Sequence, residues 1–469
     1  MRYTLLVSAL MLAMTSPAMA NDLTKVLEAA TEADPEYAAA RQNWYADQQV
    51  LTQGRAGLLP SVNASYAHLR NDVTIESTPE IDQEYDTQTT TLSLVQPLFR
   101  PENWYGYGQA RSLTNAAEAS FTQARQDFLL RVAEKYTDVL RAWDNLVASR
   151  AAERAIGRQL DQTGERFEVG LVPITDVHEA RAVYDLARVN LIVAESDFSV
   201  ARDELEAFTG KKLEFIYGLR ADLPMTGPEP ASPDAWVERA RENNPALLSA
   251  RFNADAARSA SRQSLSRQLP SVDLVGQYQH VHNLDESSNA ALAPSQTDRN
   301  GNSIGLEVSM PLFAGGALNS QRVEASYRYQ AAEEQYRLTY RDVSQSAQSL
   351  TRVVMADAQR VQARRAARLS AESALKATES GYEVGTRNAV DLLNAQQSLY
   401  QAQRDYAFAR YDYLVNSLRL KSLAGMLDKK DITDINAWLS PDVIVRLDDP
   451  VASQVKADQA SEGQQPATP

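Results

Sequence analysis

The chain contains two copies of one structural unit, separated by about 210 to 215 residues. Short motifs recur in the same order in both copies. The matching pairs are Asp34-Pro35 with Asn244-Pro245, Leu59-Pro60-Ser61-Val62 with Leu269-Pro270-Ser271-Val272, Pro97-Leu98-Phe99 with Pro311-Leu312-Phe313, and Phe167-Glu168-Val169-Gly170 with Tyr382-Glu383-Val384-Gly385. The repeat means that most of the 469 residues form two copies of one unit rather than two or three unrelated domains.

The spacing of the motifs separates rigid parts of each copy from adjustable ones. The copies differ in length between the LPSV and PLF motifs and just after PLF, and no residue is gained or lost over the following ~90 positions. An insertion within a long packed helix rotates every later side chain off its face, whereas a loop absorbs it at little cost. The constant stretch therefore predicts long packed helices in each copy.

Each copy is predicted to run helix, strand, loop, strand, long helix, tip and helix. The first helices span roughly Asp22 to Gly57 and Asp234 to Arg267. The long helices span about Asn103 to Glu168 and about Leu318 to Glu383, with apolar residues three and four apart as in a heptad repeat. The apolar face alone fits an ordinary helical bundle, but ~65 residues rising about 1.5 Å each make a rod of about 100 Å. Rods of that length indicate a coiled-coil tube.

Four short segments between the helices alternate apolar with small or polar residues and are predicted to be strands. They are Ser61 to Asn71, Thr89 to Phe99, Ser271 to Asn283 and Ser303 to Phe313. Each has about 10 residues, which is the length that a tilted transmembrane strand needs. The polar links, about Asp72 to Gln88 and about Leu284 to Asn302, are predicted to be external loops. The alternative for these segments is two surface hairpins on a soluble protein.

Four strands from one chain cannot close a barrel. In lipid every backbone N–H and C=O group needs a hydrogen bond, so an open sheet edge is not tolerated. Known bacterial barrels begin at about 8 strands. If these strands span a membrane, several chains must share one barrel. Two, three or four chains satisfy this argument equally well, and strand arithmetic leaves their number open.

Both ends of the chain are predicted to lie outside the folded part. Arg2, the apolar stretch Leu5 to Met14 and Ala18-Met19-Ala20 form a predicted signal peptide over residues 1–20, so the mature protein is expected to begin at Asn21. No later run of ~20 apolar residues indicates a membrane helix. The polar tail, residues 450–469, is predicted to be disordered.

Composition and motif searches argue against several other functions. The chain has no cysteine, which excludes disulfides, a thiol nucleophile, a thiolate metal site and an acylated N-terminal cysteine. A net charge of −14 without a basic patch argues against nucleic acid as a partner. His280 and His282 would share one strand face, but no third ligand stands at a suggestive spacing, so no metal is expected. No phosphate loop, nucleotide fingerprint or serine elbow is visible, so no catalytic residue, no cofactor and no enzymatic activity are predicted.

The motifs at the two helical tips resemble those of the TolC family of outer-membrane efflux and secretion channels. Arg166 to Val177, RFEVGLVPITDV, is similar to the first tip of the family, and Gly381 to Asp391, GYEVGTRNAVD, is similar to the second. The LPS and PLF motifs of both copies are family-like as well. The resemblance covers roughly Asn21 to Leu439.

The resemblance implies an α+β membrane protein that forms a homotrimer. Long antiparallel coiled-coil helices, twelve in the trimer, would form an α-barrel continuous with a transmembrane β-barrel of four strands per chain. The protein would lie in the lipid of the cell outer membrane with a long periplasmic extension. Its partners would be a periplasmic adaptor (membrane fusion) protein and an inner-membrane pump of the RND, ABC or MFS class.

The domain boundaries follow from the repeat together with this resemblance. Residues 21–210 form the first repeat and residues 234–425 the second. The resemblance implies an equatorial belt around the middle of the tunnel. The inter-repeat linker, residues 211–233, and the C-terminal segment, residues 426–449, are assigned to it.

By the same resemblance, Asp176, Tyr382 and Arg387 hold the periplasmic entrance closed. Arg387 and Tyr382 are expected to bond Asp176 and so to join the two helical hairpins. An exposed Arg–carboxylate pair contributes only ~0–1 kcal/mol, so three copies of such a network suit a gate that yields to a docked partner. The alternative is that these are ordinary charges at helix ends, favourable to the helix dipole.

Further tip residues take roles by the same resemblance. Asp391 corresponds to an acidic ring at the narrowest point, where three carboxylates attract cations and deter anions. The family often has a second Asp three residues later, whereas this chain has Asn394, which weakens the expected acidic constriction. The turns Gly170-Leu171 and Gly385-Thr386 are the expected adaptor contacts, and each Gly is expected to supply the conformation that ends its helix.

Together these observations predict a trimeric outer-membrane channel-tunnel that exports drugs, other toxic small molecules or proteins from inner-membrane pumps. One alternative is a trimeric coiled-coil structural or adhesin-like envelope protein without transport activity, which would stay soluble without detergent. Another is a periplasmic enzyme on a helical scaffold, which would need a polar pocket. The sequence leaves the cargo and the pump open.

Overall fold

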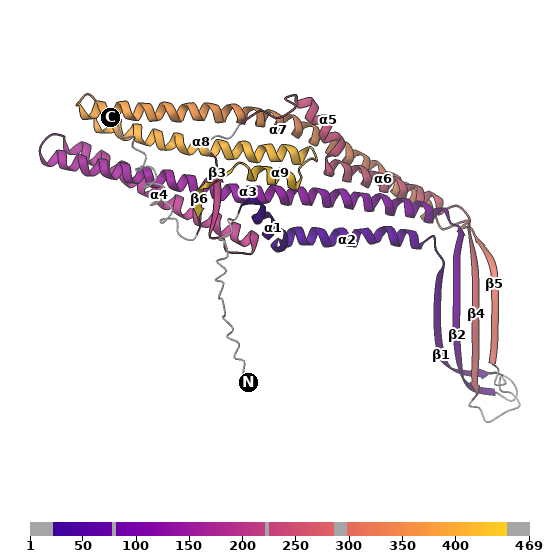
Figure 1. Ribbon diagram of the computed structural model, residues 1–469. Coiled ribbons are helices and arrows are strands. Elements are labelled where there is room, and N and C mark those ends of the chain that lie inside the picture. Colours follow the sequence, from indigo (N-terminus) through magenta and orange to yellow (C-terminus); the bar gives the residue numbers. More distant parts are fainter. Residues whose placement is uncertain (1–21, 77–80, 221–224, 286–297, 448–469) are drawn as a thin grey trace, which may run out of the picture. The chain divides into compact units, whose positions relative to one another are not determined.

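The computed structural model describes residues 22–76, 81–220, 225–285 and 298–447. The predicted signal peptide and the predicted C-terminal tail lie outside these residues. The chain forms two compact units, each of which takes parts of both sequence repeats. The first unit falls within Met1–Ala38, Arg125–Ala240 and Ser346–Pro469, and the second comprises Ala39–Ala124 and Arg241–Gln345. The labels of Figure 1 are used for the helices and strands.

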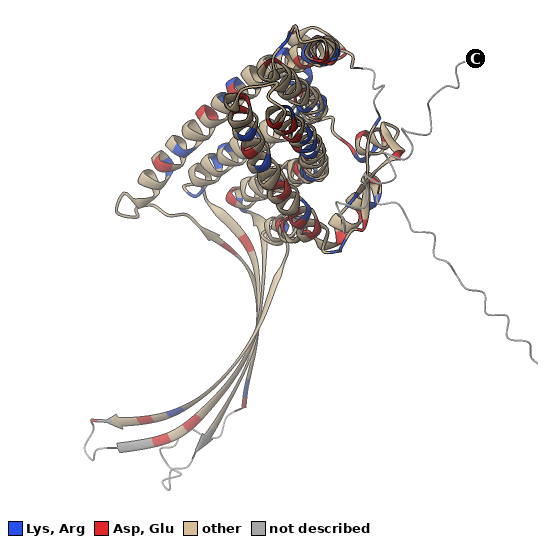
Figure 2. Ribbon diagram, turned by 90° about the vertical axis from the view of Figure 1, so that its left-hand side faces the viewer, with Lys and Arg blue, Asp and Glu red and all other residues tan. Residues whose placement is uncertain are grey.

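The second unit contains a four-stranded antiparallel sheet in the order β1-β2-β4-β5 (Figure 1). Its strands are β1 (Ser61–Ile75), β2 (Ile81–Phe99), β4 (Ser271–Asp285) and β5 (Asp298–Ser309). The hairpin of the first repeat thus lies beside the hairpin of the second, and β1 and β5 are the outer strands. Figure 2 shows charged residues at the loop ends of these strands, while their middle stretches are uncharged.

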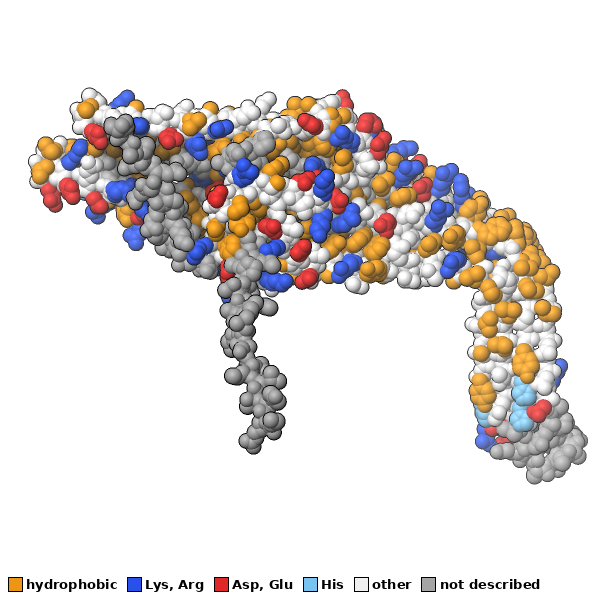
Figure 3. All heavy atoms as spheres, viewed as in Figure 1, with side chains coloured by type: hydrophobic (Ala, Val, Ile, Leu, Met, Phe, Trp, Pro, Cys, Tyr) orange, Lys and Arg blue, Asp and Glu red, His pale blue; other side chains and the backbone are white. Residues whose placement is uncertain are grey.

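The register of the sheet gives it one apolar and one polar face. Residues opposite each other in an antiparallel pair point to the same face. One row across all four strands consists of Val62, Leu94, Gly276 and Ile304. The neighbouring row, on the other face, consists of Asn63, Ser93, Gln277 and Ser303. Figure 3 shows apolar side chains along the strands on the face in view.

At their loop ends the strands extend further than predicted, so the external loops are shorter than predicted. Most of the segment Asp72 to Gln88 belongs to the β1–β2 hairpin, where the ladder continues to the pair Ile75 and Ile81. Polar alternating residues extend the sheet because they also pair across it, as Arg70 does with Glu84 at 3.0 Å. In the second repeat, β5 ends at Ser309 and not at Phe313. The chain then turns through Gly315 and Gly316, whose φ angles of 58° and 85° favour glycine.

The helices that join the sheet in the second unit belong to α2 (Pro35–Ala56), α3 (Pro101–Glu168), α6 (Pro245–Ser266) and α7 (Ala317–Glu383). The two long helices begin one or two residues before the predicted positions and end at Glu168 and Glu383, as predicted. Arg100, between β2 and α3, donates to one carboxylate oxygen of Asp273 in β4 from both Nε (3.1 Å) and Nη2 (2.6 Å). Asp273 is only 4% exposed, so this ion pair fixes the strand-to-helix junction of the first repeat.

The first helix of each repeat is broken, which the sequence analysis did not predict. The first repeat has α1 (Leu23–Ala33) and α2, and the second has α5 (Pro233–Asn243) and α6. The breaks fall at Asp34 and Asn244, because the proline that follows each one disfavours helical backbone at the preceding residue. Asn244 instead caps α6, with its side chain accepting the Leu247 N–H at 2.8 Å.

The first unit contains the rest of the chain, which packs around one large apolar cluster and several smaller ones. Its further elements are α4 (Ile174–Thr209), α8 (Ala389–Leu423), α9 (Lys429–Asn436) and a two-stranded sheet of β3 (Phe215–Leu219) and β6 (Leu439–Arg446). The core residue Tyr136 is 1% exposed and donates its hydroxyl to the carbonyl oxygen of Tyr217 in β3 at 2.7 Å. β3, α9 and β6 lie within residues 211–233 and 426–449, which were assigned to an equatorial belt without a prediction of these elements.

Candidate functional site

Two helical tips of the first unit carry the residues that the sequence analysis singled out. At the first tip, α3 ends and Gly170 takes a φ of 76°. The Gly170 N–H bonds the Phe167 carbonyl at 2.9 Å, and the Leu171 N–H bonds the Arg166 carbonyl at 2.8 Å. This pair of bonds is a Schellman motif, which closes a helix C-terminus around a left-handed residue.

The second tip repeats this turn at the end of α7. Gly385 has a φ of 78°. Its N–H bonds the Tyr382 carbonyl at 3.2 Å, while the Thr386 N–H bonds the Gly381 carbonyl at 2.8 Å. The prediction that each glycine supplies the turn is confirmed, because side chains rarely adopt this backbone conformation. Both tips expose apolar residues next to the glycine: Val169 (71%), Leu171 (73%) and Val384 (75%).

The helices that follow the tips place the predicted acidic residues in their first turns. Asp176 lies in the first turn of α4, and Asp391 in that of α8. The Asn388 side chain caps α8 by accepting the Asp391 N–H at 2.7 Å. A carboxylate in the first turn of a helix is stabilised by the helix dipole, so both aspartates are locally favoured at these positions.

The predicted gate residues are only partly in contact. The Nη1 atom of Arg387 lies 3.7 Å from Oδ2 of Asp391, and both side chains are well exposed, at 61% and 40%. A carboxylate oxygen of Asp176 accepts the hydroxyl of its neighbour Thr175 at 3.3 Å. Among the described residues of this single chain, neither Arg387 nor Tyr382 bonds Asp176. The predicted three-residue link therefore stays a prediction.

Tyr382 is the most buried of these residues. It is 6% exposed and packs against Leu375, Ala389 and Leu392. Its hydroxyl oxygen is buried and has no hydrogen-bond partner within the described part of the chain. The guanidinium of Arg166, on the other hairpin, lies 4.5 Å from the centre of its ring, which is a cation–π contact. Arg166 was not among the predicted site residues, although it lies within the first tip motif.

Asn394 stands one turn after Asp391 on α8 and is exposed. Residues three apart on a helix lie on the same side of it. The position at which the family often carries a second aspartate is therefore on the same side as Asp391, and in this chain it is neutral.

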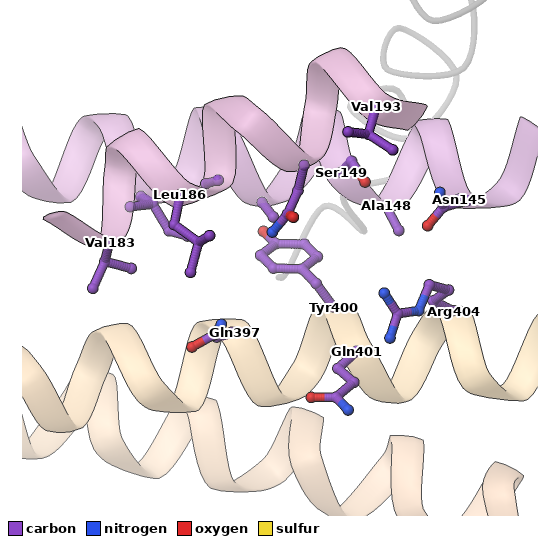
Figure 4. A pocket seen from close by; sticks show the side chains of 14 residues that line it. Asn145, Ala148, Ser149, Val183, Leu186, Val193, Gln397, Tyr400, Gln401 and Arg404 are labelled. Atoms are coloured by element: carbon purple, nitrogen blue, oxygen red, sulfur yellow. The ribbon is translucent and has the colours of Figure 1, made fainter. Parts of the chain in front are cut away.

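A groove of about 360 Å³ lies between α3, α4 and α8 (Figure 4). The groove is lined by Tyr400 and by six other polar residues, which are Asn145, Ser149, Asn190, Gln397, Gln401 and Arg404. Burial raises the pKa of Tyr400. None of the lining residues is a carboxylate, a histidine or a cysteine, so the groove has neither a general base nor a set of metal ligands.

In the described part of the chain, no cluster of three or more His, Cys, Asp or Glu side chains is placed to hold a metal ion. His280 Nδ1 lies 2.6 Å from the Asn300 side-chain oxygen, and His282 pairs with Asp298. These contacts tie β4 to β5.

No helix within the described ranges combines the length and the apolar character that crossing a membrane requires.

Comparison with known proteins matches both repeats to one family. Residues 26–211 and 236–426 match the family described as outer membrane efflux protein. The outer membrane protein TolC of Vibrio cholerae is 33% identical over 435 residues, which cover 93% of this chain and 98% of that protein. The alkaline protease secretion protein AprF of Pseudomonas aeruginosa is 32% identical over 92% of this chain and 89% of its own length.

The fold is also similar to that of solved structures. The outer membrane protein VceC from Vibrio cholerae matches with a TM-score of 0.69 and 22% identity, covering 86% of this chain and 96% of that one.

Proposed function

Because this chain belongs to the outer membrane efflux protein family, we propose that three copies of it form one channel-tunnel whose periplasmic entrance is gated at the helical tips. Membership of the family gives the location, the cell outer membrane, and the activity, which is transport and not catalysis. Channels of this family work with inner-membrane pumps and adaptor proteins. The trimer, the closed barrel and the gate are the parts proposed here.

The observation that carries the proposal is the four-stranded sheet with one apolar face, one polar face and two outer strands that face no further strand within the described chain. In β4 the stretch from Leu274 to Leu284 is free of Asp, Glu, Lys and Arg, and about 9 to 11 residues span a membrane as a tilted strand. Apolar residues of the sheet are exposed in one chain, as Ile304 is at 79%, which fits a surface that lipid covers.

A barrel shared between copies provides hydrogen-bond partners for the backbone of the two outer strands. If β5 of one copy pairs with β1 of the next, no backbone edge is left open to lipid. Three copies of this four-stranded sheet then give twelve strands with the polar rows of Asn63 and Ser93 facing the lumen. A polar interior with an apolar exterior is the pattern of an outer-membrane channel.

The helical part also exposes a surface that a second copy would cover. Helix α4 carries apolar side chains spaced at three, four and seven residues, each about half exposed. They are Leu186, Val189, Val193 and Val200. This spacing is typical of a coiled-coil seam, so we assign the stripe to the contact between neighbouring subunits in the α-barrel.

At the tips, the assembled trimer supplies the partners that a single chain lacks. Within the described residues of one chain, the buried hydroxyl of Tyr382 has no hydrogen-bond partner and the guanidinium of Arg387 has an exposed contact to Asp391. Bonds from both residues to Asp176 would join adjacent hairpins and hold the entrance closed. Because each exposed ion pair contributes only about 0–1 kcal/mol, docking of an adaptor at the apolar tip residues is sufficient to open the gate.

The three copies of Asp391 would form an acidic ring at the entrance. Carboxylates gathered around one axis attract cations and repel anions. Asn394 adds no second ring, so this entrance selects cations less strongly than one with two acidic rings.

We propose that the channel serves an inner-membrane pump of the RND, ABC or MFS class through a periplasmic adaptor. The relative named for alkaline protease secretion supports proteins as one class of cargo, beside drugs and other toxic small molecules. Planar bilayers test the proposal. The purified protein should insert from detergent and conduct ions through a small resting entrance, whereas a structural coiled-coil protein would give no channels. Deletion of the gene should also raise the susceptibility of its host to detergents and drugs, or stop secretion of a protein.

A further inference from the structure

The two tips share one turn but carry different residues at equivalent positions. The third residue before each turn glycine is Phe167 in the first repeat and Tyr382 in the second, and the residue before that is Arg166 in the first and Gly381 in the second. Phe167 is 39% exposed, whereas Tyr382 is 6% exposed. Tyr382 packs against Leu375, Ala389 and Leu392, and Arg166 covers its ring from the opposite hairpin.

We infer that Arg166 is the positioning residue of the gate: its guanidinium holds the ring of Tyr382 across the two hairpins, and closure of the resting entrance depends on that contact. This inference rests on the proposed gating function and concerns how the site is regulated. Arg166 does not touch cargo, and it acts through Tyr382.

The geometry supports a direct hold on the ring. The Cζ atom of Arg166 lies 4.5 Å from the ring centre of Tyr382, well inside the range of a cation–π contact. No carboxylate of the described chain lies within ion-pair distance of this guanidinium, so the ring is the partner that the structure gives it. Leu375 and Leu392 pack against the ring as well. The ring therefore sits in an apolar socket closed by one cation.

The position of Arg166 at the end of α3 favours this role. Its carbonyl accepts the Leu171 N–H at 2.8 Å, so its backbone is part of the first tip turn. A cation in the last turn of a helix is stabilised by the helix dipole. Leu171 is 73% exposed and belongs to the same turn as Arg166. A partner that binds Leu171 would therefore move the backbone of Arg166. Displacement of that turn would then release Tyr382.

At the equivalent position of the second tip, Gly381 leaves room for Arg387. A Cβ atom at Gly381 would lie 2.8 Å from Cγ of Arg387 and 3.2 Å from Oγ1 of Thr386. The Gly381 carbonyl also accepts the N–H groups of Thr386 (2.8 Å) and Arg387 (3.1 Å). A side chain here would displace Arg387. At this position the first tip therefore has Arg166, which contacts the Tyr382 ring, and the second tip has Gly381, which leaves space for Arg387.

The test compares resting conductance of purified full-length channels in planar bilayers. Arg166→Met keeps an apolar stem of similar length but removes the charge, and it should raise the resting conductance severalfold. Arg166→Lys keeps a cation and should stay closer to the parent channel. The double variant Arg166→Met with Tyr382→Leu should be no more open than Tyr382→Leu alone, because Arg166 acts through the ring that Tyr382→Leu removes. A purely structural role at the tip would not produce rescue by lysine or this lack of additivity.

Two matched controls accompany these variants. Phe167→Leu changes the position equivalent to Tyr382 in the other repeat, and Arg181→Met removes an exposed arginine of α4; neither should change the resting conductance. If Arg166→Met does not assemble, Arg166→Gln takes its place with the same expectation.

The outcomes separate this inference from the gate itself. If Arg387→Ser opens the channel while both uncharged Arg166 variants that assemble conduct like the parent, the role of Arg166 is wrong and the gate stands. If Arg166→Met and Tyr382→Leu open the channel additively, Arg166 acts elsewhere and the inference is also wrong. If neither Arg387→Ser nor any Arg166 or Tyr382 variant changes the conductance, the proposed gate fails together with it.

Discussion

Arg387 lies 3.7 Å from Asp391, one turn further along the same part of the chain, and does not reach Asp176 on the other hairpin. The long, exposed contact is easily exchanged, since such pairs contribute about 0–1 kcal/mol at most. Arg387 is therefore free to take a carboxylate from a neighbouring hairpin when subunits assemble. We therefore propose that the tip network, and not the helical core, is the part of the molecule that opens.

The combined variant Arg387→Ser with Tyr382→Phe should open the resting entrance. It removes both groups that are proposed to bond Asp176, while the Tyr382 ring stays in its socket. The single-channel conductance of the purified protein should rise severalfold. If the conductance stays at the parent value, the assignment of these residues to the gate is wrong.

Asp391 should control ion selectivity at the entrance. Asp391→Ala removes the proposed acidic ring and should sharply reduce cation preference, as measured by the reversal potential under a salt gradient. Asn394→Asp should add a second ring on the same side of α8 and strengthen block by hexamminecobalt. An unchanged reversal potential in Asp391→Ala would place this side chain outside the conducting path.

The buried carboxyl of Asp144 should make the helical unit less stable as pH rises. Burial raises the pKa of Asp144, an effect that the hydrogen bond from Tyr411 (2.7 Å) and the charge of Arg410 offset in part. The folded state therefore keeps this proton at pH values where the unfolded chain has lost it, and the contribution of Asp144 to stability falls as pH rises from the usual carboxyl range, about 4, through the raised pKa.

Asp144→Asn tests this effect. The variant cannot ionise, so its apparent melting temperature relative to the parent should be higher at pH 7 than at pH 4. Tyr411→Phe is the opposite case, because it leaves the buried carboxyl without its donor and should destabilise the protein by about 1–3 kcal/mol. A melting difference between Asp144→Asn and the parent that is the same at both pH values would contradict the account.

Removal of Arg100 should loosen the junction between sheet and helix. Asp273 is 4% exposed, and one of its oxygens already lacks a partner within the described residues. Arg100→Ala would leave this carboxylate buried and unpaired, at a cost of about 3–5 kcal/mol. The temperature at which the proposed trimer dissociates on SDS gels should fall, and adding Asp273→Asn should recover most of the loss. No change on Arg100→Ala would show that the ion pair does not stabilise the junction.

The long helices were predictable from the sequence, because an uninterrupted heptad pattern of constant length leaves little freedom in where they begin and end. The breaks at Asp34 and Asn244 were missed since the prolines served only as markers of the repeat. The first hairpin loop was placed too early because polar residues such as Asp72 and Glu84 do not signal a strand, although they face each other in the ladder. Arg166 was missed as a site residue because its contact to Tyr382 joins distant parts of the chain, and no local pattern encodes such a contact.

The central claim is that β1 of one copy pairs with β5 of another, and disulfide cross-linking tests it most directly. The chain has no cysteine of its own, so a cysteine at Ser61 can be combined with single cysteines scanned along β5 from Ile304 to Ser309. A second pair at Thr91 and Gln279, which face each other in β2 and β4, is the control and should link only within one chain. The account predicts that at least one β1–β5 pair yields covalent oligomers up to the trimer on denaturing gels. If every β1–β5 cross-link forms within a single chain and runs as a monomer, the shared barrel, and with it the proposed assembly, is wrong.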